Sequence, residues 1–416
     1  MPKLTTTNCE LDLDCYPKVS SHIQQPWDAA DLYLIEHASP GKYPAILNDQ
    51  WGALSCHINS LGLQYYSWTD SFCSQKAISN NLSKLSLPLA SSIERVHLEE
   101  TVSETPSEAG PILHETPKTT RPEIQKVQGA PCFPEKIDTL WIQCPKSFDQ
   151  LHWWLSLALE QIGSGITVSI AGMAKHIPIK WLNWLEQHTD DYQQFPIQKK
   201  ARLIQLKLPK QLPPLNVLKS YSGTDNLVLE APPGVFSRDH MDIGSRFFIH
   251  HLSSLPPLVG KVIDLGCGNG LLSIAALQYS DADNIDLILT DDSALALGAA
   301  KANLEMRKYT KADFHHTDAL LGIKTTADSI LCNPPFHTGN RVSTAAAERM
   351  FRQATQILSR NGQLLVIANR HLGYAASLKK LFSTVQLLTS DSKFVIYRCR
   401  QAKKGHTKHS PSPQEL

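Results

Sequence analysis

The 416-residue sequence lacks a long hydrophobic run, since no window approaches 18 uninterrupted apolar residues. A helix that spans a membrane needs such a run, so the sequence predicts a protein without membrane spans. The first residues, MPKLTTTNCELDLDCYPK, also lack the apolar core and the small-residue cleavage site of a secretory signal. We therefore expect a cytoplasmic protein.

Paired cysteines are missing as well. The nine cysteines are an odd number and fall singly, with no C-x-x-C pair, which argues against a disulfide framework and against a thiolate zinc site. Among the 17 histidines, His250-His251 and His315-His316 are adjacent, not four residues apart as in helical zinc sites. The sequence predicts reduced thiols and no metal.

Charge of one sign is also scarce, because the net charge is only +1 and does not indicate a nucleic-acid partner by itself. The end of the chain is locally basic (RCRQAKKGHTKH, 398–409), whereas residues 94–108 lean acidic. A basic end can hold phosphates, although a solvated tail explains it equally well. We expect residues 401–416 to form a basic flexible tail.

The length and the 26 prolines exceed what one hydrophobic core usually serves, so two domains are expected. Alternating helical and strand-like stretches predict an α/β fold with two doubly wound, mostly parallel sheets, the second ending in an antiparallel hairpin. A Thr-, Ser-, Pro- and Glu-rich stretch predicts a disordered insertion in the first domain at 98–136. The predicted parts are an N-terminal segment (1–26), a first domain (27–208), a connector (209–232), a second domain (233–400) and the tail.

The two halves resemble each other locally. PAILNDQWGALS in the first aligns with VIDLGCGNGLLS in the second, which places Gly52 opposite Gly270. Asn48 and Gln50 replace the other two glycines of the turn. Since glycine lets a ligand approach the backbone, the first domain should be a degenerate copy without a cofactor.

The strongest local signal is VIDLGCGNG, an apolar strand followed by a glycine-rich turn and a helix. Its G-x-G-x-G spacing differs from the G-x-G-x-x-G of dinucleotide sites. An acid just before the turn would repel phosphate but suits the ammonium of an amino-acid moiety. The candidate cofactor residues of this turn are Asp264, Gly266, Cys267, Gly268, Asn269 and Gly270.

Acidic residues follow the next two strands. Asp291 ends a strand about 20 residues beyond the last glycine, where a carboxylate can accept both ribose hydroxyl hydrogens. Asp292 is the second candidate, although an Asp here can also cap the helix that follows. Asp318 follows the third strand and is a candidate partner for an adenine amino group.

The fourth strand ends in Asn333-Pro334-Pro335-Phe336. The two prolines fix the backbone so that the Asn side-chain oxygen and the Pro334 carbonyl can accept both hydrogens of one NH₂ group. Phe336 offers a surface on which an extruded base can stack, worth about 1–3 kcal/mol. Together with the glycine turn, this quartet predicts methyl transfer to a nucleobase amine.

These residues resemble a known family. The turn and the quartet are similar to those of amino-methyltransferases, and PGVFSRDHMDIGSRFFIHHL (233–252) resembles the bacterial rRNA guanine-N2 methyltransferases. Those enzymes have two tandem methyltransferase-like domains, the first without cofactor. The stretches WDAADLYL, ILNDQWGALSC, KKARLI, CNPPFH, IANRHLGY and KFVIYR resemble the large-subunit (23S rRNA) branch. The resemblance covers nearly the whole chain except the insertion, the first twenty-odd residues and the extreme C-terminus.

The resemblance implies S-adenosylmethionine as cofactor and 23S rRNA or a large-subunit assembly intermediate as partner. The patterns above predict no membrane and no metal, and the sequence leaves the oligomeric state open, with a monomer as the working assumption. It places Asp264, Gly266, Gly268, Asp291 and Asp318 on the cofactor and the quartet on a flipped guanine. Phe236 to Arg238 and Asp242 would flank the methionine end or the incoming base.

For the first domain, the resemblance places Cys144-Pro145-Lys146 at the position of the quartet, so this domain should bind RNA or chaperone its partner. Lys199, Lys200 and Arg202 are candidate phosphate contacts, or a solvated cluster. Arg370 and His371 follow the fifth strand, where substrate should enter, or cap a loop.

Other functions remain open at this stage. The same quartet suits a 16S rRNA guanine, adenine N6 or the side-chain amide of a protein glutamine. A non-catalytic RNA-binding assembly protein is the alternative from another class, although it would not need both the glycine turn and the quartet. The glycine spacing disfavours a dehydrogenase.

Overall fold

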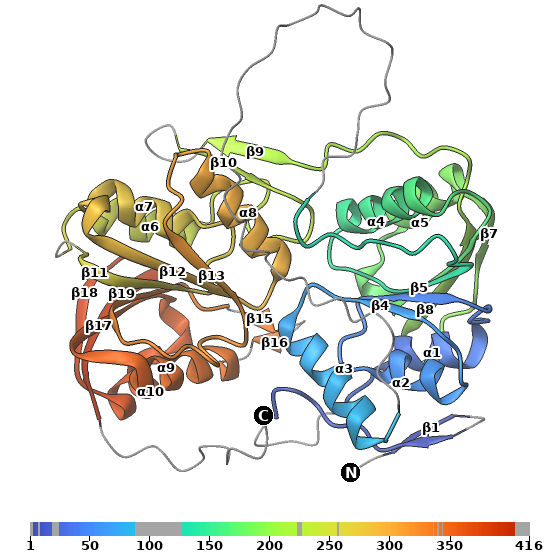
Figure 1. Ribbon diagram of the computed structural model, residues 1–416, viewed down its shortest axis with the longest axis horizontal. Coiled ribbons are helices and arrows are strands. Elements are labelled where there is room, and N and C mark those ends of the chain that lie inside the picture. Colours follow the sequence, from blue (N-terminus) through green and yellow to red (C-terminus); the bar gives the residue numbers. More distant parts are fainter. Residues whose placement is uncertain are drawn as a thin grey trace, which may run out of the picture.

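The computed structural model describes residues 3–6, 9–18, 25–87, 127–222, 227–255, 258–335, 337–338, 341–342 and 344–403. Two α/β domains lie side by side in it (Figure 1). The expected tail from 404 onward and most of the expected insertion, residues 98–126, lie outside the described residues.

The first domain contains a six-stranded sheet in the order β4-β3-β5-β6-β8-β7. Its strands are β3 (Pro44–Leu47), β4 (Tyr66–Trp68), β5 (Thr139–Gln143), β6 (Thr167–Met173), β7 (Asp190–Gln194) and β8 (Ala201–Lys207). Its helices are α1 (Ala29–His37), α2 (Ala53–Ser60), α3 (Phe72–Lys84), α4 (Phe148–Gln161) and α5 (Ile179–His188), with the 3₁₀ turn η1 (Ala174–His176). The first four strands of this order are parallel, and β8 and β7 are antiparallel additions.

The second domain repeats this order with one more strand, as β13-β12-β11-β14-β17-β19-β18. Its strands are β11 (Gly260–Leu265), β12 (Ile285–Asp291), β13 (Ala312–His316), β14 (Ala327–Cys332), β17 (Leu358–Asn369), β18 (Phe382–Ser390) and β19 (Phe394–Ala402). Its helices are α6 (Ile243–Leu252), α7 (Leu271–Tyr279), α8 (Ala294–Glu305), α9 (Ala345–Ile357) and α10 (Tyr374–Leu381), with the 3₁₀ turns η3 (Ala282–Asn284) and η4 (Arg370–Leu372). Within this sheet the pairs β17–β19 and β19–β18 are antiparallel and the others are parallel, so the sheet ends in the antiparallel hairpin that the sequence predicts.

Helices cover both faces of each sheet. In the second domain, α6, α7 and α8 bury apolar side chains against one face, and α9 and α10 against the other. In the first domain, α1 and α2 pack on one face and α4 and α5 on the other. This doubly wound arrangement, repeated in tandem, confirms the predicted fold class.

Three short hairpins lie outside the main sheets. They are β1 (Leu4–Thr5) with β2 (Glu10–Leu11), β9 (Lys219–Ser222) with β10 (Val228–Ala231), and β15 (His337–Thr338) with β16 (Arg341–Val342). Leu4, Leu11 and Leu13 pack with buried residues of α2 and α3. The N-terminal segment is therefore part of the first domain's core.

The connector is more ordered than its prolines suggest. Residues 219–222 and 228–231 pair as the β9–β10 hairpin, and Leu227 and Leu229 are buried in the second domain's core. The prolines of this stretch suggested an irregular connector and did not predict this strand pair, whose leucines are buried. The second domain therefore begins well before residue 233.

The end of the expected insertion also requires correction. Phe133 is only 5% exposed and its ring lies 5.9 Å from that of Tyr66, so residues around it belong to the folded first domain. Its backbone NH donates to Gln161 Oε1 at 2.6 Å. The composition of the stretch did not predict this, because a single buried aromatic residue holds an otherwise polar segment against the domain.

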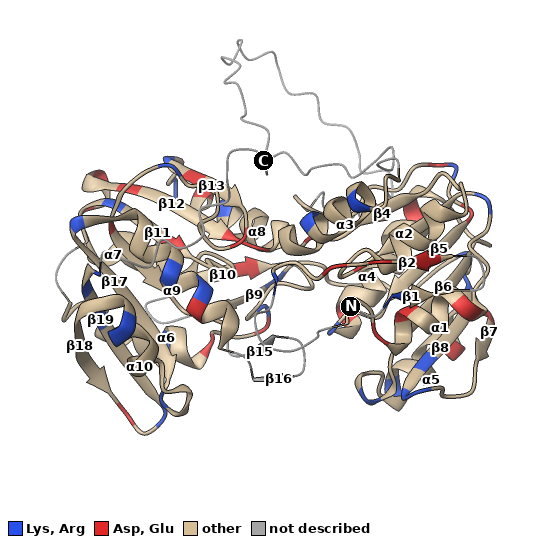
Figure 2. Ribbon diagram, turned by 90° about the horizontal axis from the view of Figure 1, so that it is seen from below, with Lys and Arg blue, Asp and Glu red and all other residues tan. Residues whose placement is uncertain are grey.

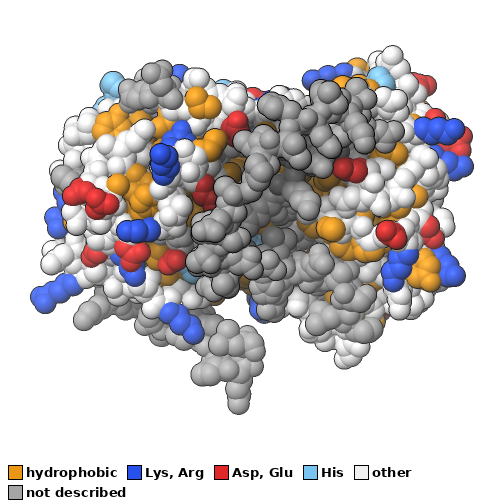
Figure 3. All heavy atoms as spheres, turned by 45° about the horizontal axis from the view of Figure 1, so that its top comes forward, with side chains coloured by type: hydrophobic (Ala, Val, Ile, Leu, Met, Phe, Trp, Pro, Cys, Tyr) orange, Lys and Arg blue, Asp and Glu red, His pale blue; other side chains and the backbone are white. Residues whose placement is uncertain are grey.

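Acidic and basic residues are interspersed over both domains (Figure 2), and the face in Figure 3 shows the same mixture. In the described part of the chain, no helix is long and apolar enough to cross a membrane. The described residues also contain no group of three or more His, Cys, Asp or Glu side chains that could hold a metal ion.

Candidate active site

The glycine turn connects β11 to α7 at the carboxyl edge of the second sheet. Gly266, Gly268 and Gly270 all adopt positive φ, at 75°, 56° and 83°. A Cβ on Gly270 would lie 3.1 Å from Ala300 Cα, so this glycine lets α7 approach α8. A Cβ on Gly268 would meet no atom within 4 Å. Space beside Gly268 is therefore open to a ligand.

Asp264 lies on β11 just below the turn and is 1% exposed. Its Oδ2 accepts hydrogen bonds from Ser273 N at 3.0 Å and from Ser273 Oγ at 2.6 Å. Its Oδ1 is buried without a partner among the described residues. Burial raises the pKa of Asp264 to about 6. This carboxyl therefore stabilises the start of α7 and has one acceptor to spare.

Asp291 ends β12 beside the same turn. Its Oδ2 accepts from Gly268 N and its Oδ1 from Ser293 N, both at 2.9 Å. Burial raises the pKa of Asp291 to about 7, although these two backbone hydrogen bonds lower it. A carboxylate has about four acceptor positions, so both oxygens can still accept hydroxyl groups.

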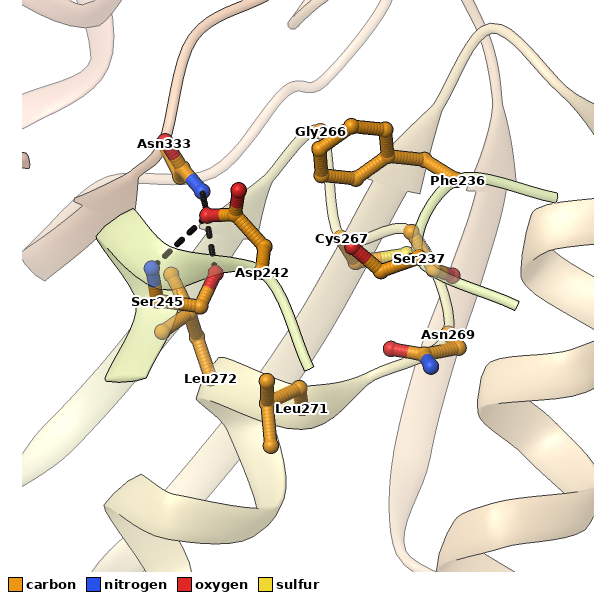
Figure 4. A pocket seen from close by; sticks show the side chains of 11 residues that line it. Phe236, Ser237, Asp242, Ser245, Gly266, Cys267, Asn269, Leu271, Leu272 and Asn333 are labelled. Atoms are coloured by element: carbon orange, nitrogen blue, oxygen red, sulfur yellow. Dashed lines mark hydrogen bonds between the residues drawn. The ribbon is translucent and has the colours of Figure 1, made fainter. Parts of the chain in front are cut away.

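Asn333 follows β14 and is held by the start of α6. Its Nδ2 donates to Asp242 Oδ2 at 3.1 Å and to Ser245 Oγ at 2.9 Å (Figure 4). A carboxylate can only accept hydrogen bonds, so Asp242 orients the Asn333 amide with its nitrogen toward the start of α6. The Oδ1 atom of Asn333 is buried and has no partner among the described residues. It is an acceptor that lacks a donor.

Part of the glycine turn and Asn333 line one pocket, whereas Asp264, Gly270 and Asp291 lie behind the turn and are not among its lining residues. The pocket is formed by Phe236, Ser237, Asp242, Ser245, Gly266, Cys267, Gly268, Asn269, Leu271, Leu272 and Asn333. Phe236 is 62% exposed and lies across the pocket from Asn333 (Figure 4). Pro334 is buried and Pro335 exposed, whereas Phe336 lies outside the described residues.

Several predicted site residues are not brought into this pocket. Arg238 is 6% exposed and bonds with Asp149 of the first domain through its Nη1, at 2.6 Å. Its other nitrogens donate to the carbonyls of Ala231, Asn216 and Val217. Arg238 therefore links the start of the second domain both to the first domain and to the connector.

Asp292 and Asp318 are also engaged elsewhere. Asp292 accepts from Ser71 Oγ at 2.7 Å and from Cys73 N at 2.8 Å, both in the first domain. Asp318 is ion-paired with Arg349 at 2.8 Å and hydrogen-bonded to Tyr16. Burial raises the pKa of Asp318 despite the Arg349 charge. In this structure their carboxyl groups hold protein partners.

The candidate phosphate contacts lie on the surface. Lys199 and Lys200 are exposed in the loop between β7 and β8, and Arg202 Nη1 donates to Gln194 Oε1 at 2.7 Å. Both lysines adopt positive φ, at 46° and 68°. In the second domain, Arg370 and His371 lie in η4; Arg370 donates to Asp391 O, and His371 Nδ1 lies 2.9 Å from Asn369 Oδ1.

The first domain keeps a remnant of the site, one residue away from where the sequence places it. Leu47 pairs with Ile142 as Leu265 pairs with Cys332, so Gln143, not Cys144, is the counterpart of Asn333. Gln143 Nε2 donates to Asp31 Oδ1 at the start of α1, at 2.9 Å. Neither amide–acid pair was predicted from the sequence. The available signal was an acid in the N-terminal turn of an apolar helix, as the N-cap Asp242 of α6 and as the third residue Asp31 of α1.

In the first domain, the equivalent turn is occupied by one of its own side chains. Asn48 retains the left-handed backbone of Gly266, with φ at 66°, but Gln50 does not adopt a positive φ. The side chain of Asp49 is 1% exposed and accepts from Gly52 N and Ser55 N. Its own carboxyl thus occupies the centre of the turn, as expected for a degenerate copy.

Comparisons with known proteins cover both domains. A family model described as RLMG N-terminal domain matches residues 1–122 and 120–210, and one described as Methyltransferase small domain matches residues 226–398. Ribosomal RNA large subunit methyltransferase G of Pseudoalteromonas translucida is 31% identical, over 89% of this chain and 91% of that protein. The chain belongs to the ribosomal RNA large subunit methyltransferase G family.

A second relative supports the family, and a solved structure supports the fold. The Aliivibrio fischeri (strain MJ11) protein of the same name is 31% identical, over 97% of this chain and 99% of that protein. A solved T. thermophilus 16S rRNA N2 methyltransferase (RsmC), in complex with AdoMet and guanosine, has a TM-score of 0.71 and 18% identity, covering 96% of this chain and 97% of that one. The resemblance found in the sequence is therefore confirmed at the family level, and the N-terminal match includes the first residues.

Proposed function

We propose that the second domain transfers a methyl group from S-adenosylmethionine to the exocyclic N2 amine of a guanine in 23S rRNA. As a member of its family, the protein is a large-subunit rRNA methyltransferase of the S-adenosylmethionine-dependent class. The relatives named above carry large-subunit rRNA in their names, which supports the choice of RNA. The finer proposal rests on Asn333, which lines the pocket and whose buried side-chain oxygen has no partner among the described residues.

The pocket suits the cofactor chemically. The open side of Gly268 admits close approach to the backbone, and Asp291 offers carboxylate oxygens for ribose hydroxyls beside it. The buried, partnerless Oδ1 of Asp264 supplies negative charge below the turn that would receive an ammonium group. When bound, S-adenosylmethionine supplies an electrophilic methyl group on its sulfonium.

Asn333 would orient and activate the amine. The lone pair of a nucleobase NH₂ is delocalised into the ring, so it is a poor nucleophile. One N–H donated to Asn333 Oδ1 and the other to the Pro334 carbonyl would direct that lone pair toward the methyl group. Asn333 Oδ1 and the Pro334 carbonyl would hold the amine while an N–C bond replaced the S–C bond of the cofactor, and the methylated amine would release one proton to solvent. No strong base is required.

The substrate base would leave its helix to reach Asn333. Flipping costs a few kcal/mol, which stacking on an aromatic ring offsets by about 1–3 kcal/mol. Phe336 is the predicted surface, and the exposed ring of Phe236 across the pocket is a second one. Lys199, Lys200 and Arg202 are proposed to hold rRNA phosphates on the first domain. We propose that the protein acts as a monomer in the cytoplasm.

The test is transfer of labelled methyl from S-adenosylmethionine to protein-free 23S rRNA, to 16S rRNA and to large subunits, all from a strain lacking this protein. Nucleoside analysis should find N2-methylguanosine in 23S rRNA alone. Label in 16S rRNA, in adenosine or in protein would show that the labelled molecule is the substrate and that the proposed guanine of 23S rRNA is not. An absence of label together with failure to bind S-adenosylmethionine would favour a non-catalytic RNA-binding assembly protein.

A further inference from the structure

Two equivalent strand ends meet at the interface between the domains. Trp68 on β4 pairs with Leu47 as Thr290 on β12 pairs with Leu265, so Asp70-Ser71 corresponds to Asp292-Ser293. Ser293 Oγ donates to Asp70 Oδ2 at 2.6 Å, and Ser71 Oγ donates to Asp292 Oδ2 at 2.7 Å. The two hydrogen bonds are the reciprocal arms of a pseudo-twofold contact.

The backbone follows the same symmetry. Phe72 N donates to Asp292 O at 2.7 Å, and Ala294 N donates to Asp70 O at 2.9 Å. His316 Nε2, on β13, lies 2.9 Å from Asp70 O and 2.8 Å from Asp292 O. Since both partners are carbonyl oxygens, this nitrogen must carry the proton.

Only one arm of this contact reaches the pocket. Ser293 N donates to Asp291 Oδ1, and Asp291 Oδ2 accepts from Gly268 N. Asp70, Ser293, Asp291 and Gly268 thus form a continuous series of hydrogen bonds from the first domain to the glycine turn. On the other arm, the position of Asp291 is occupied by Thr69.

Packing keeps this series of contacts in place. Leu295, Ala296 and Ala299 of α8 are buried within the core of the first domain. A Cβ added to Gly298 on the same helix would lie 2.8 Å from Gln128 O of the first domain. The N-terminus of α8 therefore cannot shift without disturbing that core.

We propose that Asp70, in the domain without a cofactor, is a positioning residue of the cofactor site: through Ser293 it fixes the carboxylate of Asp291 that receives the cofactor ribose. The inference depends on the proposed cofactor but not on the RNA substrate. The first domain then completes the cofactor site of the second, in addition to any contact with RNA.

The full chain tests this proposal by calorimetric titration with S-adenosylhomocysteine. Asp70→Ala and Ser293→Ala should each weaken binding about three- to tenfold, the effect of one hydrogen bond. Asp70→Asn keeps an acceptor for Ser293 and should bind within about twofold of wild type. Ser71→Ala is the matched control because it removes the opposite arm and, like Ser293→Ala, one helix N-cap.

Ser71→Ala should lower the melting temperature as much as Ser293→Ala yet leave binding within about twofold of wild type. Equal weakening by both serine variants would show a merely structural interface and overturn the proposal, as would wild-type affinity in Asp70→Ala. If Asp70→Ala does not fold, the two serine variants and Asp70→Asn still decide. If wild-type protein itself fails to bind, the proposed function fails instead.

Discussion

At the scale of single residues, acceptors dominate the pocket and its floor. Asp242 holds the amide nitrogen of Asn333, and the buried carbonyl oxygen of that amide has no partner among the described residues. Asp264 and Asp291 add carboxyl groups whose pKa burial raises to about 6 and about 7. Such a site selects ligands that carry donors: an ammonium group, ribose hydroxyls and an amine.

Replacing Asn333 by Ala should abolish methyl transfer while sparing the cofactor. The variant loses the acceptor that activates the amine, and kcat should fall roughly 10²-fold or more, as when one preorganised group is removed from an active site. The affinity for S-adenosylhomocysteine should stay within about threefold of wild type, because Asp291 and the glycine turn are untouched. Single-turnover rates and calorimetry measure the two effects. An equal loss of both would mean that Asn333 holds the cofactor.

Cofactor affinity should depend on pH through Asp291. Its ionised form accepts ribose hydroxyls, and with a pKa of about 7 the ionised fraction rises about tenfold from pH 6 to pH 8. S-adenosylhomocysteine should therefore bind up to about tenfold more tightly at pH 8 than at pH 6. Asp291→Asn should bind weakly with a much flatter profile, because the variant lacks the carboxyl group whose pKa lies in this range. An unchanged pH profile in the variant would assign the dependence to Asp264.

The raised pKa of Asp291 has the opposite effect on the free energy of unfolding of the protein without ligand. Between the ordinary Asp pKa and about 7, the folded protein retains a proton on Asp291 that the unfolded chain releases. This group therefore makes the free energy of unfolding decrease as pH rises through that window. Asp291 therefore destabilises the fold most above pH 7, in the same range in which we expect the tightest cofactor binding.

At the scale of elements, local patterns predicted what depends on neighbours in sequence. The β11 strand, the glycine turn and α7 follow from one continuous local pattern, and the β18–β19 hairpin from alternation and a turn. Long-range partners could not be predicted in this way. The hydrogen bond of Asp292 to Ser71 spans 221 positions, so its predicted role was inferred without its actual partner.

The connector was misjudged for a related reason, since its order depends on Arg238. This side chain donates to carbonyls on both sides of the β9–β10 hairpin and pairs with Asp149. Burial would raise the pKa of Asp149, but hydrogen bonds from Lys219 and Arg238 outweigh it and lower the pKa. No sequence pattern reveals such an arrangement of groups around one guanidinium.

Arg238→Ala should therefore destabilise the protein rather than impair chemistry directly. It removes the closer of the two cationic partners of Asp149 and one donor from each of three carbonyls. Because Asp149 is 31% exposed and keeps Lys219, we expect a loss of about 1.5–3 kcal/mol, the value of hydrogen bonds to a charged group. Urea unfolding at neutral pH measures this change. Arg238→Lys should recover little of it, because an ammonium cannot reach all four acceptors. Wild-type stability with weakened RNA binding would instead support the substrate role expected from the sequence.

At the scale of the whole molecule, one fold has been used twice with different outcomes. Both domains keep an amide that bonds to an acidic side chain at the start of a helix: Asn333 with Asp242, and Gln143 with Asp31. In the first domain the carboxyl of Asp49 fills the turn, which leaves the pocket of the second as the site. What the first domain retains is the interface face, where α8 is buried in its core.

If the domains form one cooperative unit, Gly298→Ala should destabilise the whole chain. Alanine is favoured over glycine in a helix by about 0.5–1 kcal/mol, but its Cβ would lie 2.8 Å from the backbone oxygen of Gln128. Overpacking of this kind costs about 1–3 kcal/mol, so the clash should win. Urea unfolding of the full chain should show a net loss of about 1–2 kcal/mol in a single transition, against a change within about 0.5 kcal/mol for the exposed control Glu305→Ala. A Gly298→Ala protein more stable than wild type would mean that helix propensity prevails and that the two domains can separate along α8.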